Sequence, residues 1–153
     1  MKHDELDLEA FLPSRLSVLS NTISARLAEA DGNRYGMTIS EWRVMAILGR
    51  CPGSSAAEVA RKGAMDKVAV SRAVSRLLDA GRIRRRFADA DRRRSILELS
   101  AEGRRIYRGI TPVLLAYETR LLESLDATER RRLDGILDRL YERARELPAP
   151  GLD

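Results

Sequence analysis

The periodicity of apolar residues changes from that of a helix to that of a strand immediately after Gly81, and that change limits the folds that the chain can adopt. Before it, the run KVAVSRAVSRLLDAG carries Val70, Val74 and Leu77 at the spacing of one helical face. After it, RIRRRF and SILEL place apolar residues at alternate positions, which is typical of half-buried strands. The loop ADADRRR between them has no glycine for a tight turn. The sequence therefore predicts a helix followed by an antiparallel hairpin with a long loop.

A second, shorter helix is predicted just before this one. Ser55 and Glu58 have the spacing of a capping box, and AAEVARKG ends at Gly63. Asp66 then stands where the cap of the next helix is expected. A short helix, a brief turn and a longer helix with a polar second face form a helix-turn-helix pattern. Because a hairpin follows directly, the pattern predicts a winged helix.

Amphipathic helices are predicted before the winged helix. Residues 13–31 carry apolar residues at steps of three and four, and Pro13 suits the first position because its missing N–H costs nothing there. Thr38 and Glu41 have capping-box spacing and open a second helix that ends at CPGS. Both helices are therefore expected to bury one face.

Two longer helices are predicted after the hairpin. Ser100 caps the first of them, and Pro112 is predicted to kink it. Asp126 and Glu129 repeat the capping-box spacing at the start of the last helix. Residues 147–153, with the sequence LPAPGLD, are predicted to form a flexible tail.

The composition excludes several kinds of chemistry. The chain has 153 residues, 44% hydrophobic and 33% charged, which is typical of one globular domain, and no run approaches the roughly 20 apolar residues of a membrane span. A single cysteine, Cys51, and a single histidine, His3, rule out a zinc site built from these ligands and an intramolecular disulfide. No catalytic site, metal or cofactor is predicted. The acidic N-terminus lacks the pattern of a secretory signal, so a cytoplasmic location is expected.

Positive charge is concentrated in one third of the chain. Residues 61–105 contain 14 of the 28 lysines and arginines but only 6 of the 23 aspartates and glutamates. Such a cluster is typical of a protein that binds a polyanion. The alternative is a solvated charged surface, and the charge alone does not separate the two.

These motifs, in this order, resemble the multiple antibiotic resistance regulator (MarR) family over essentially the whole chain. The matching pieces are LPSRLSVLSNTIS, MTISEWRVMAIL, VSRAVSRLLDAGRI and DRRRSILELSAEG. The resemblance implies a single, mainly α domain over residues 1–153 with a two-stranded β wing, in which 38–100 bind DNA and 13–31 and 101–146 form dimerisation helices. The apolar positions predicted for the core and the dimer contact are Leu12, Leu16, Leu19, Leu121, Leu133, Ile136, Leu137 and Leu140.

The resemblance also implies a function. Members of the family are homodimeric transcription regulators, mostly repressors, and many release DNA when a small phenolic or anionic ligand binds. A two-fold dimer implies a pseudo-palindromic double-stranded operator whose half-sites lie about 34 Å apart. The alternative is a winged-helix module that docks an acidic protein partner, and an enzyme is a more distant one.

The helix after Asp66 is the predicted recognition helix. With its apolar stripe turned inward, its polar face can enter a major groove, where Arg72 suits guanine O6 and N7 and Ser71 suits a base or a phosphate. The alternative is that Arg72 and Arg76 only form surface pairs with Asp79 or nearby acids. The residues predicted to contact DNA from this helix are Lys67, Val68, Ser71, Arg72, Ser75 and Arg76.

The hairpin loop is the second predicted contact. In the resemblance its Asp-x-Arg element falls on Asp91 and Arg93, with Arg93 in the minor groove and Asp91 holding it from behind. Arg92 and Arg94 flank it and are predicted to meet phosphates. The alternative is a solvated turn.

Arginines and a cysteine outside the loop have smaller predicted roles. Arg84 and Arg86 lie on the strand face opposite Phe87 and are predicted only to hydrate that strand. Cys51 is predicted to be a structural bystander, because the peroxide-sensing branch of the family carries its cysteine near the start of the first long helix.

An aromatic set is the predicted effector site. Trp42, Tyr107 and Tyr117, with Tyr35 beside them, are candidates to line a pocket between the dimerisation helices and the DNA-binding part. The alternative is that these rings belong to the core and the dimer contact.

Overall fold

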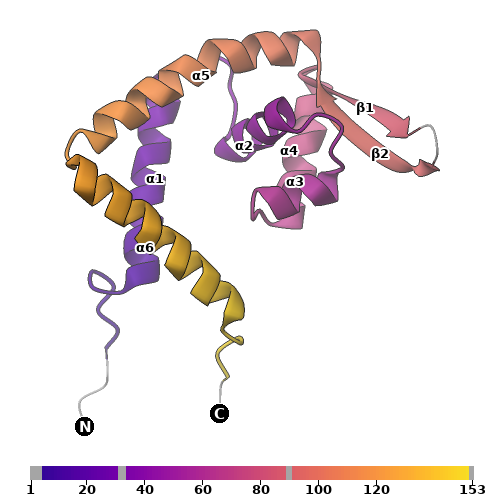
Figure 1. Cartoon of the computed structure of the whole chain (residues 1–153). Helices are drawn as coiled ribbons and strands as arrows, with labels where there is room; N and C mark the ends of the chain where they lie inside the picture. The colour runs from indigo at the N-terminus through magenta and orange to yellow at the C-terminus, as the bar shows by residue number, and fades with distance from the viewer. Residues whose placement is uncertain (1–4, 31–33, 89–90, 152–153) are drawn as a thin grey trace. The chain divides into compact units, whose positions relative to one another are not determined.

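The computed structural model in Figure 1 describes residues 5–30, 34–88 and 91–151, with the backbone alone at positions 30, 88 and 91–94. Two compact units are resolved, one ending at Val113 and the other beginning at Leu114. In the described part of the chain, no helix is long and apolar enough to cross a membrane. The helices are α1 (Leu12–Ala30), α2 (Ile39–Arg50), α3 (Ala56–Lys62), α4 (Lys67–Asp79), α5 (Ala101–Leu122) and α6 (Ala127–Glu146), and the strands are β1 (Ile83–Ala88) and β2 (Asp91–Leu99).

The core of the first unit lies where α2, α3, α4 and the hairpin meet, as the winged-helix pattern predicts. The predicted capping box of α3 is complete, and the Asp66 side chain accepts from the Ala69 N–H at the start of α4. Gly81, with a φ of 66°, turns the chain out of α4 into β1. The largest side chains that are almost fully buried are Met45, Leu48, Leu77, Leu97, Ile106, Val44, Val59 and Val70.

The capping box predicted at the start of α2 is only half formed. The Thr38 hydroxyl oxygen accepts from the Glu41 N–H at 3.2 Å, as predicted. The Glu41 carboxylate does not return to Thr38 and lies instead 3.2 Å from Nε of Arg76 on α4. The long-range ion pair has therefore replaced the second half of the predicted local motif.

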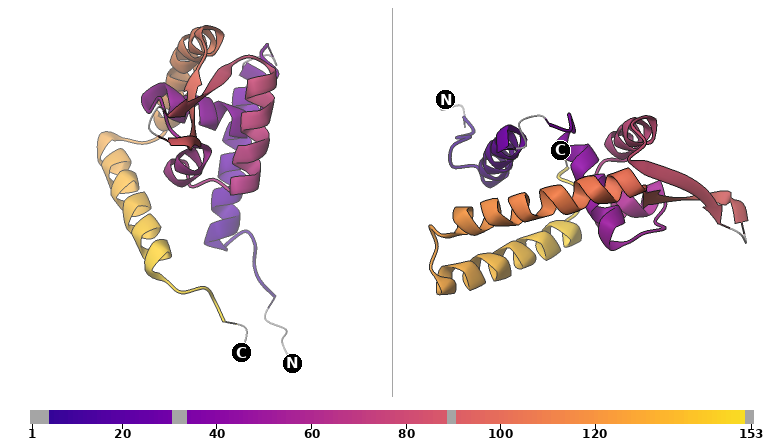
Figure 2. Two further views of the ribbon diagram at one scale, coloured as in Figure 1. Left: turned by 90° about the vertical axis from the view of Figure 1, so that its right-hand side faces the viewer. Right: turned by 90° about the horizontal axis from the view of Figure 1, so that it is seen from above.

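The hairpin is antiparallel, pairs Ile83 with Leu99 and Arg85 with Leu97, and extends away from the three helices (Figure 2). The predicted long loop is wrong, because β2 already begins at Asp91. The run DRRR contains neither proline nor glycine, so nothing in it interrupts extended backbone. An irregularity in the pairing lies between Phe87 and the next residue.

A backbone contact that the sequence did not indicate joins the hairpin to the loop before α3. The Gly53 N–H donates to the Leu97 carbonyl at 2.9 Å, and the Leu97 N–H donates to the Ser54 carbonyl at 2.8 Å. Ser54 therefore forms an isolated antiparallel β-bridge with Leu97 beside the two-stranded sheet. The inner end of the wing is held by main-chain hydrogen bonds as well as by apolar packing.

The start of α5 packs closely on the end of α4. The Ser100 hydroxyl donates to the Gly81 carbonyl at 2.6 Å and accepts from the Gly103 N–H at 3.0 Å, so the predicted cap is present. In the same turn, hydrogen bonds from Arg105 hold the pKa of the exposed Glu102 below its ordinary value. Helix α5 is continuous through Pro112.

In the second unit, the end of α5 and α6 form a helical hairpin (Figure 2). Asp126 and Glu129 form the complete capping box that was predicted. Helix α6 has no buried residue among those described, and Ile136, Leu137 and Leu140 are 43%, 43% and 39% exposed. These side chains were predicted for the core or the dimer contact, and they do not lie in the core of this chain.

Candidate nucleic-acid interface

Helix α4 carries the predicted recognition face. Val70, Val74 and Leu77 are at most 3% exposed and fix one side of the helix against the core. Because residues three and four apart share a helical face, the other side is left to solvent. The structure brings together on that exposed side all six predicted contact residues, Lys67, Val68, Ser71, Arg72, Ser75 and Arg76.

The dimensions and chemistry of this face suit the major groove. With 13 residues the helix is about 20 Å long, and the groove is about 12 Å wide. Its side chains offer ammonium, guanidinium and hydroxyl donors, and Val68, 56% exposed, adds an apolar contact. This combination matches the donors, acceptors and thymine methyl groups on base edges.

Arg76 is the one residue of the face that has a charged partner among the described ion pairs. Its Nε lies 3.2 Å from Oε1 of Glu41, and the arginine side chain is 65% exposed whereas the glutamate is 5% exposed. The sequence left open that Arg76 forms an ion pair with Asp79 or a nearby acid. The structure shows an ion pair for Arg76, but its partner is a carboxylate on α2. The pair leaves most of the arginine accessible.

The hairpin arginines make more contacts than predicted. Nε of Arg84 and Nε of Arg86 lie 3.0 and 2.9 Å from the same oxygen of Glu98, whose side chain is only 13% exposed. Glu98 is directly opposite Arg84 in the register, so all three side chains lie on one face of the hairpin. The prediction that these arginines only hydrate the strand is wrong. Their contact lowers the net positive charge of that face and fixes the arginines in place.

The predicted minor-groove element lies at the start of β2. The structure gives the backbone of Asp91, Arg92, Arg93 and Arg94 as extended strand. Their side chains lie outside the described residues. The arrangement of Arg93 in front of Asp91 therefore stays a prediction.

Comparison with known proteins supports the resemblance to the MarR family. A family model described as the MarR family matches residues 35–94, which contain the complete helix-turn-helix and most of the hairpin. The transcriptional repressor Rv2887 of Mycobacterium tuberculosis is 29% identical over 124 residues, which are 81% of this chain and 86% of that protein. The chain is therefore similar to MarR-family regulators over most of its length.

Solved structures show the same fold. A MarR/EmrR family transcriptional regulator from Acinetobacter sp. ADP1 superposes with a TM-score of 0.84 at 22% identity, covering 93% of this chain and 100% of that one. The PcaV transcriptional regulator of Streptomyces coelicolor, solved with its natural ligand, gives a TM-score of 0.78 at 23% identity, covering 93% and 99%. The chain thus has the winged-helix fold of these regulators.

The predicted effector residues are divided between the two units. Trp42 stacks on Tyr107, with ring centroids 5.8 Å apart and planes at 21°. The Tyr107 ring also covers Gly49, where an added Cβ would lie 2.8 Å from Cζ. Tyr117 belongs to the second unit and lines a hollow of about 400 Å³ with Arg120, Leu121 and Glu123. The stacked rings of Trp42 and Tyr107 therefore favour the alternative, in which these residues belong to the packed core, over a role as the wall of an open pocket.

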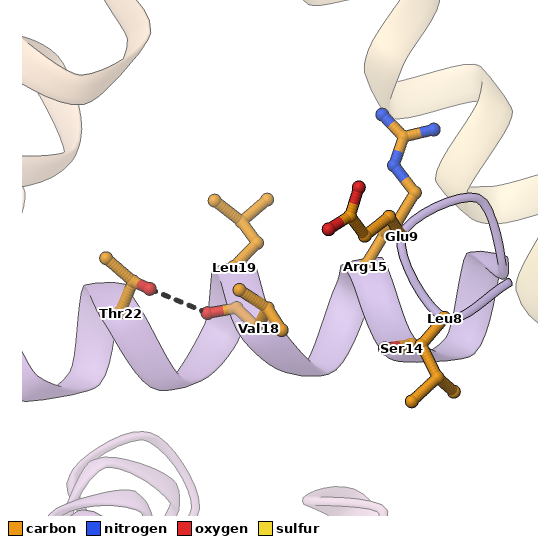
Figure 3. Close-up of a pocket in the computed structure, with 7 residues that line it drawn as sticks. All are labelled: Leu8, Glu9, Ser14, Arg15, Val18, Leu19 and Thr22. Carbon is orange, nitrogen blue, oxygen red and sulfur yellow. Dashed lines mark hydrogen bonds between the residues drawn. The ribbon is translucent and has the colours of Figure 1, made fainter.

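A hollow that the sequence did not indicate lies along α1. It has a volume of about 560 Å³ and follows the apolar residues Val18 and Leu19, which are 62% and 53% exposed (Figure 3). Leu8 closes one end, and Thr22 at the other end is held by its hydrogen bond to the Val18 carbonyl. Only the exposure of these apolar residues, which periodicity cannot reveal, would have located it.

Proposed function

We propose that this chain is a transcription regulator of the MarR type, a homodimer that binds double-stranded DNA in a sequence-specific way, with α4 in the major groove and Arg93 of the wing in the minor groove. The observation that supports this most is the exposed face of α4, where six polar, basic or methyl-bearing side chains lie opposite a fully buried stripe. A helix held in this way presents base-reading groups on a rigid support.

Dimerisation is supported by apolar side chains that this chain leaves uncovered. Exposed leucines and isoleucines repeat at helical spacing on α1 and, separately, on α6, and no described residue of α6 is buried. An apolar surface of this extent is typical of a protein contact, and a two-fold pair of chains covers it with the same surface of the second copy. The exposed positions are Leu12, Leu16, Val18, Leu19, Ile136, Leu137, Leu140 and Tyr141.

Repression relieved by a small molecule is the mode of regulation that we propose. Rv2887 is a repressor, and PcaV has a natural ligand in its structure. A phenolic or anionic ligand can bind more tightly to a dimer whose two α4 helices have a spacing that does not fit the operator. The ratio of its affinities for the two spacings then sets the largest factor by which it can lower operator affinity. An operator pseudo-palindrome with half-sites about 34 Å apart follows from the two-fold axis.

Binding to duplex DNA as a function of salt tests the proposal. Selection of bound sequences from a random duplex pool provides the operator, and its affinity is then measured between 50 and 200 mM salt. Contacts to several phosphates require a steep linear fall of log K with log salt concentration. A winged-helix module that docks a protein would bind no duplex even at low salt, and that result would refute the proposed function.

Arg72→Ala is expected to change which operator sequences are preferred. Arg72 is exposed on the groove-facing side of α4, and a bidentate contact to guanine contributes about 1–3 kcal/mol of discrimination. Repeating the sequence selection with the variant measures the change. Equal weakening on all sequences would instead identify Arg72 as a phosphate contact.

Arg93→Ala is expected to weaken operator binding by about 1–3 kcal/mol while the melting temperature stays nearly unchanged. The expectation rests on the Asp-x-Arg element of the sequence. Fluorescence anisotropy with the selected operator and thermal unfolding give the two quantities. A loss of stability with unchanged DNA affinity would contradict the minor-groove role.

A further inference from the structure

Glu41 is a buried carboxylate that the fold alone does not account for. It is 4% exposed, and among the described residues its Oε1 has no partner in hydrogen-bond geometry. Its nearest charged group is Nε of Arg76, 3.2 Å away, so the contact is an ion pair without an aligned hydrogen bond. A carboxylate taken out of water is unfavourable unless it is well paired. Helix α2 gains no complete capping box from it, because the carboxylate has turned away from Thr38.

The Nη atoms of Arg76 can bind a group outside the protein. The ion pair engages Nε, whereas most of the five N–H donors of a guanidinium are on Nη1 and Nη2. The side chain is 65% exposed on the same face of α4 as Arg72. A guanidinium whose Nε side faces a buried carboxylate has its Nη donors left for another anion, and a phosphate suits their planar arrangement.

The position along α4 favours a phosphate over a base. The N-terminal residues of a recognition helix contact base edges, and Arg76 follows Arg72 by one helical turn toward the C-terminal end. Side chains nearer that end meet the edge of the groove, where the phosphates are. An arginine oriented before DNA arrives also loses less side-chain freedom when it binds.

We propose that Glu41 is a positioning residue for DNA recognition, which holds Arg76 by Nε so that its Nη atoms bind a phosphate of the operator backbone. The proposal rests on the proposed function, because it requires α4 to lie against DNA. It assigns to α2 a part in DNA affinity although α2 itself makes no contact in this arrangement.

The direction in which operator affinity changes when the charge of Glu41 is removed distinguishes a positioning role from an effect of net charge. Removal of a negative charge near a polyanion should strengthen binding if only the net charge matters. If Glu41 positions Arg76, Glu41→Gln should weaken operator binding by roughly three- to tenfold and make the slope of log K against log salt shallower by about one phosphate contact. Asp79→Asn is the matched control: it removes the same charge from an exposed position on α4, and unchanged or slightly tighter binding is expected.

A double-mutant cycle with Arg76→Gln completes the test. Arg76→Gln should lower the slope as Glu41→Gln does, and Glu41→Gln should have no further effect in the Arg76→Gln background. Since Arg76→Gln alone leaves a buried charge unpaired, the double variant, which has two neutral side chains, is the one to measure if the single variant folds poorly. A lower folded fraction reduces apparent affinity without changing the slope, so the slope still reports the phosphate contact.

Several results would overturn the positioning role while leaving DNA binding by the wild type intact. These are tighter binding by Glu41→Gln, a slope equal to that of the wild type, or a further loss when Glu41→Gln is added to Arg76→Gln. By contrast, a wild-type protein that shows no salt-dependent binding to duplex would refute the proposed function itself, and the positioning role with it.

Discussion

Gly103→Ala is expected to destabilise the winged-helix unit by about 3 kcal/mol, because a methyl group has no room there. A Cβ built at Gly103 lies 1.9 Å from the backbone oxygen of Arg82, so α5 must move away from the end of α4 to admit it. That oxygen also accepts from the Ser100 N–H, so the movement also disturbs the start of α5. Urea unfolding followed by circular dichroism measures the change.

Gly135→Ala on α6 is the matched control for this substitution. Nothing lies within 4 Å of a Cβ added at Gly135, and alanine favours a helix over glycine by up to about 1 kcal/mol. The control is therefore expected to be neutral or stabilising. Equal unfolding midpoints for the two variants would contradict the close contact between Gly103 and Arg82.

Leu137→Glu is expected to separate the proposed dimer into monomers and to lower operator affinity by a hundredfold or more. The side chain is 43% exposed in the single chain and lies on the apolar face of α6, where a second copy would bury an unpaired charge. Loss of the dimer removes the gain from binding two half-sites with one molecule, which ranges from about 10² to 10⁴. Analytical ultracentrifugation and an operator titration give the two results.

Arg131→Gln changes the net charge by the same amount on the polar face of α6 and should leave both the dimer and operator binding intact. A wild-type protein that sediments as a monomer, or a Leu137→Glu variant that remains dimeric, would refute the role proposed for this face.

The sequence predicted those parts of the fold that depend on local periodicity and caps. The exposed face of α4 was predictable because Val70, Val74 and Leu77 alone determine which side turns inward. The complete capping boxes of α3 and α6 were predictable for the same reason, since both partners lie within one turn.

Features that depend on tertiary contacts escaped prediction. The spacing of Thr38 and Glu41 is that of a capping box, but Arg76, 35 positions further along the chain, pairs with the carboxylate instead. Gly103 looks like an unfavourable residue in a helix until the carbonyl of Arg82 is placed beside it. Residue type alone predicts the aromatic set, and it does not show that Tyr107 packs on Trp42 while Tyr117 lies in the other unit.

The bridge between Ser54 and Leu97 has a consequence for exchanging parts between related regulators. If residues 83–99 alone were transplanted, the segment that bonds to the inner end of the wing would be left behind. The orientation of the wing relative to the recognition helix would then depend on the corresponding loop of the recipient protein. A working chimera should therefore carry residues 51–54 together with the hairpin. The loop before α3 and the wing form one exchangeable piece, although 28 residues separate them in the chain.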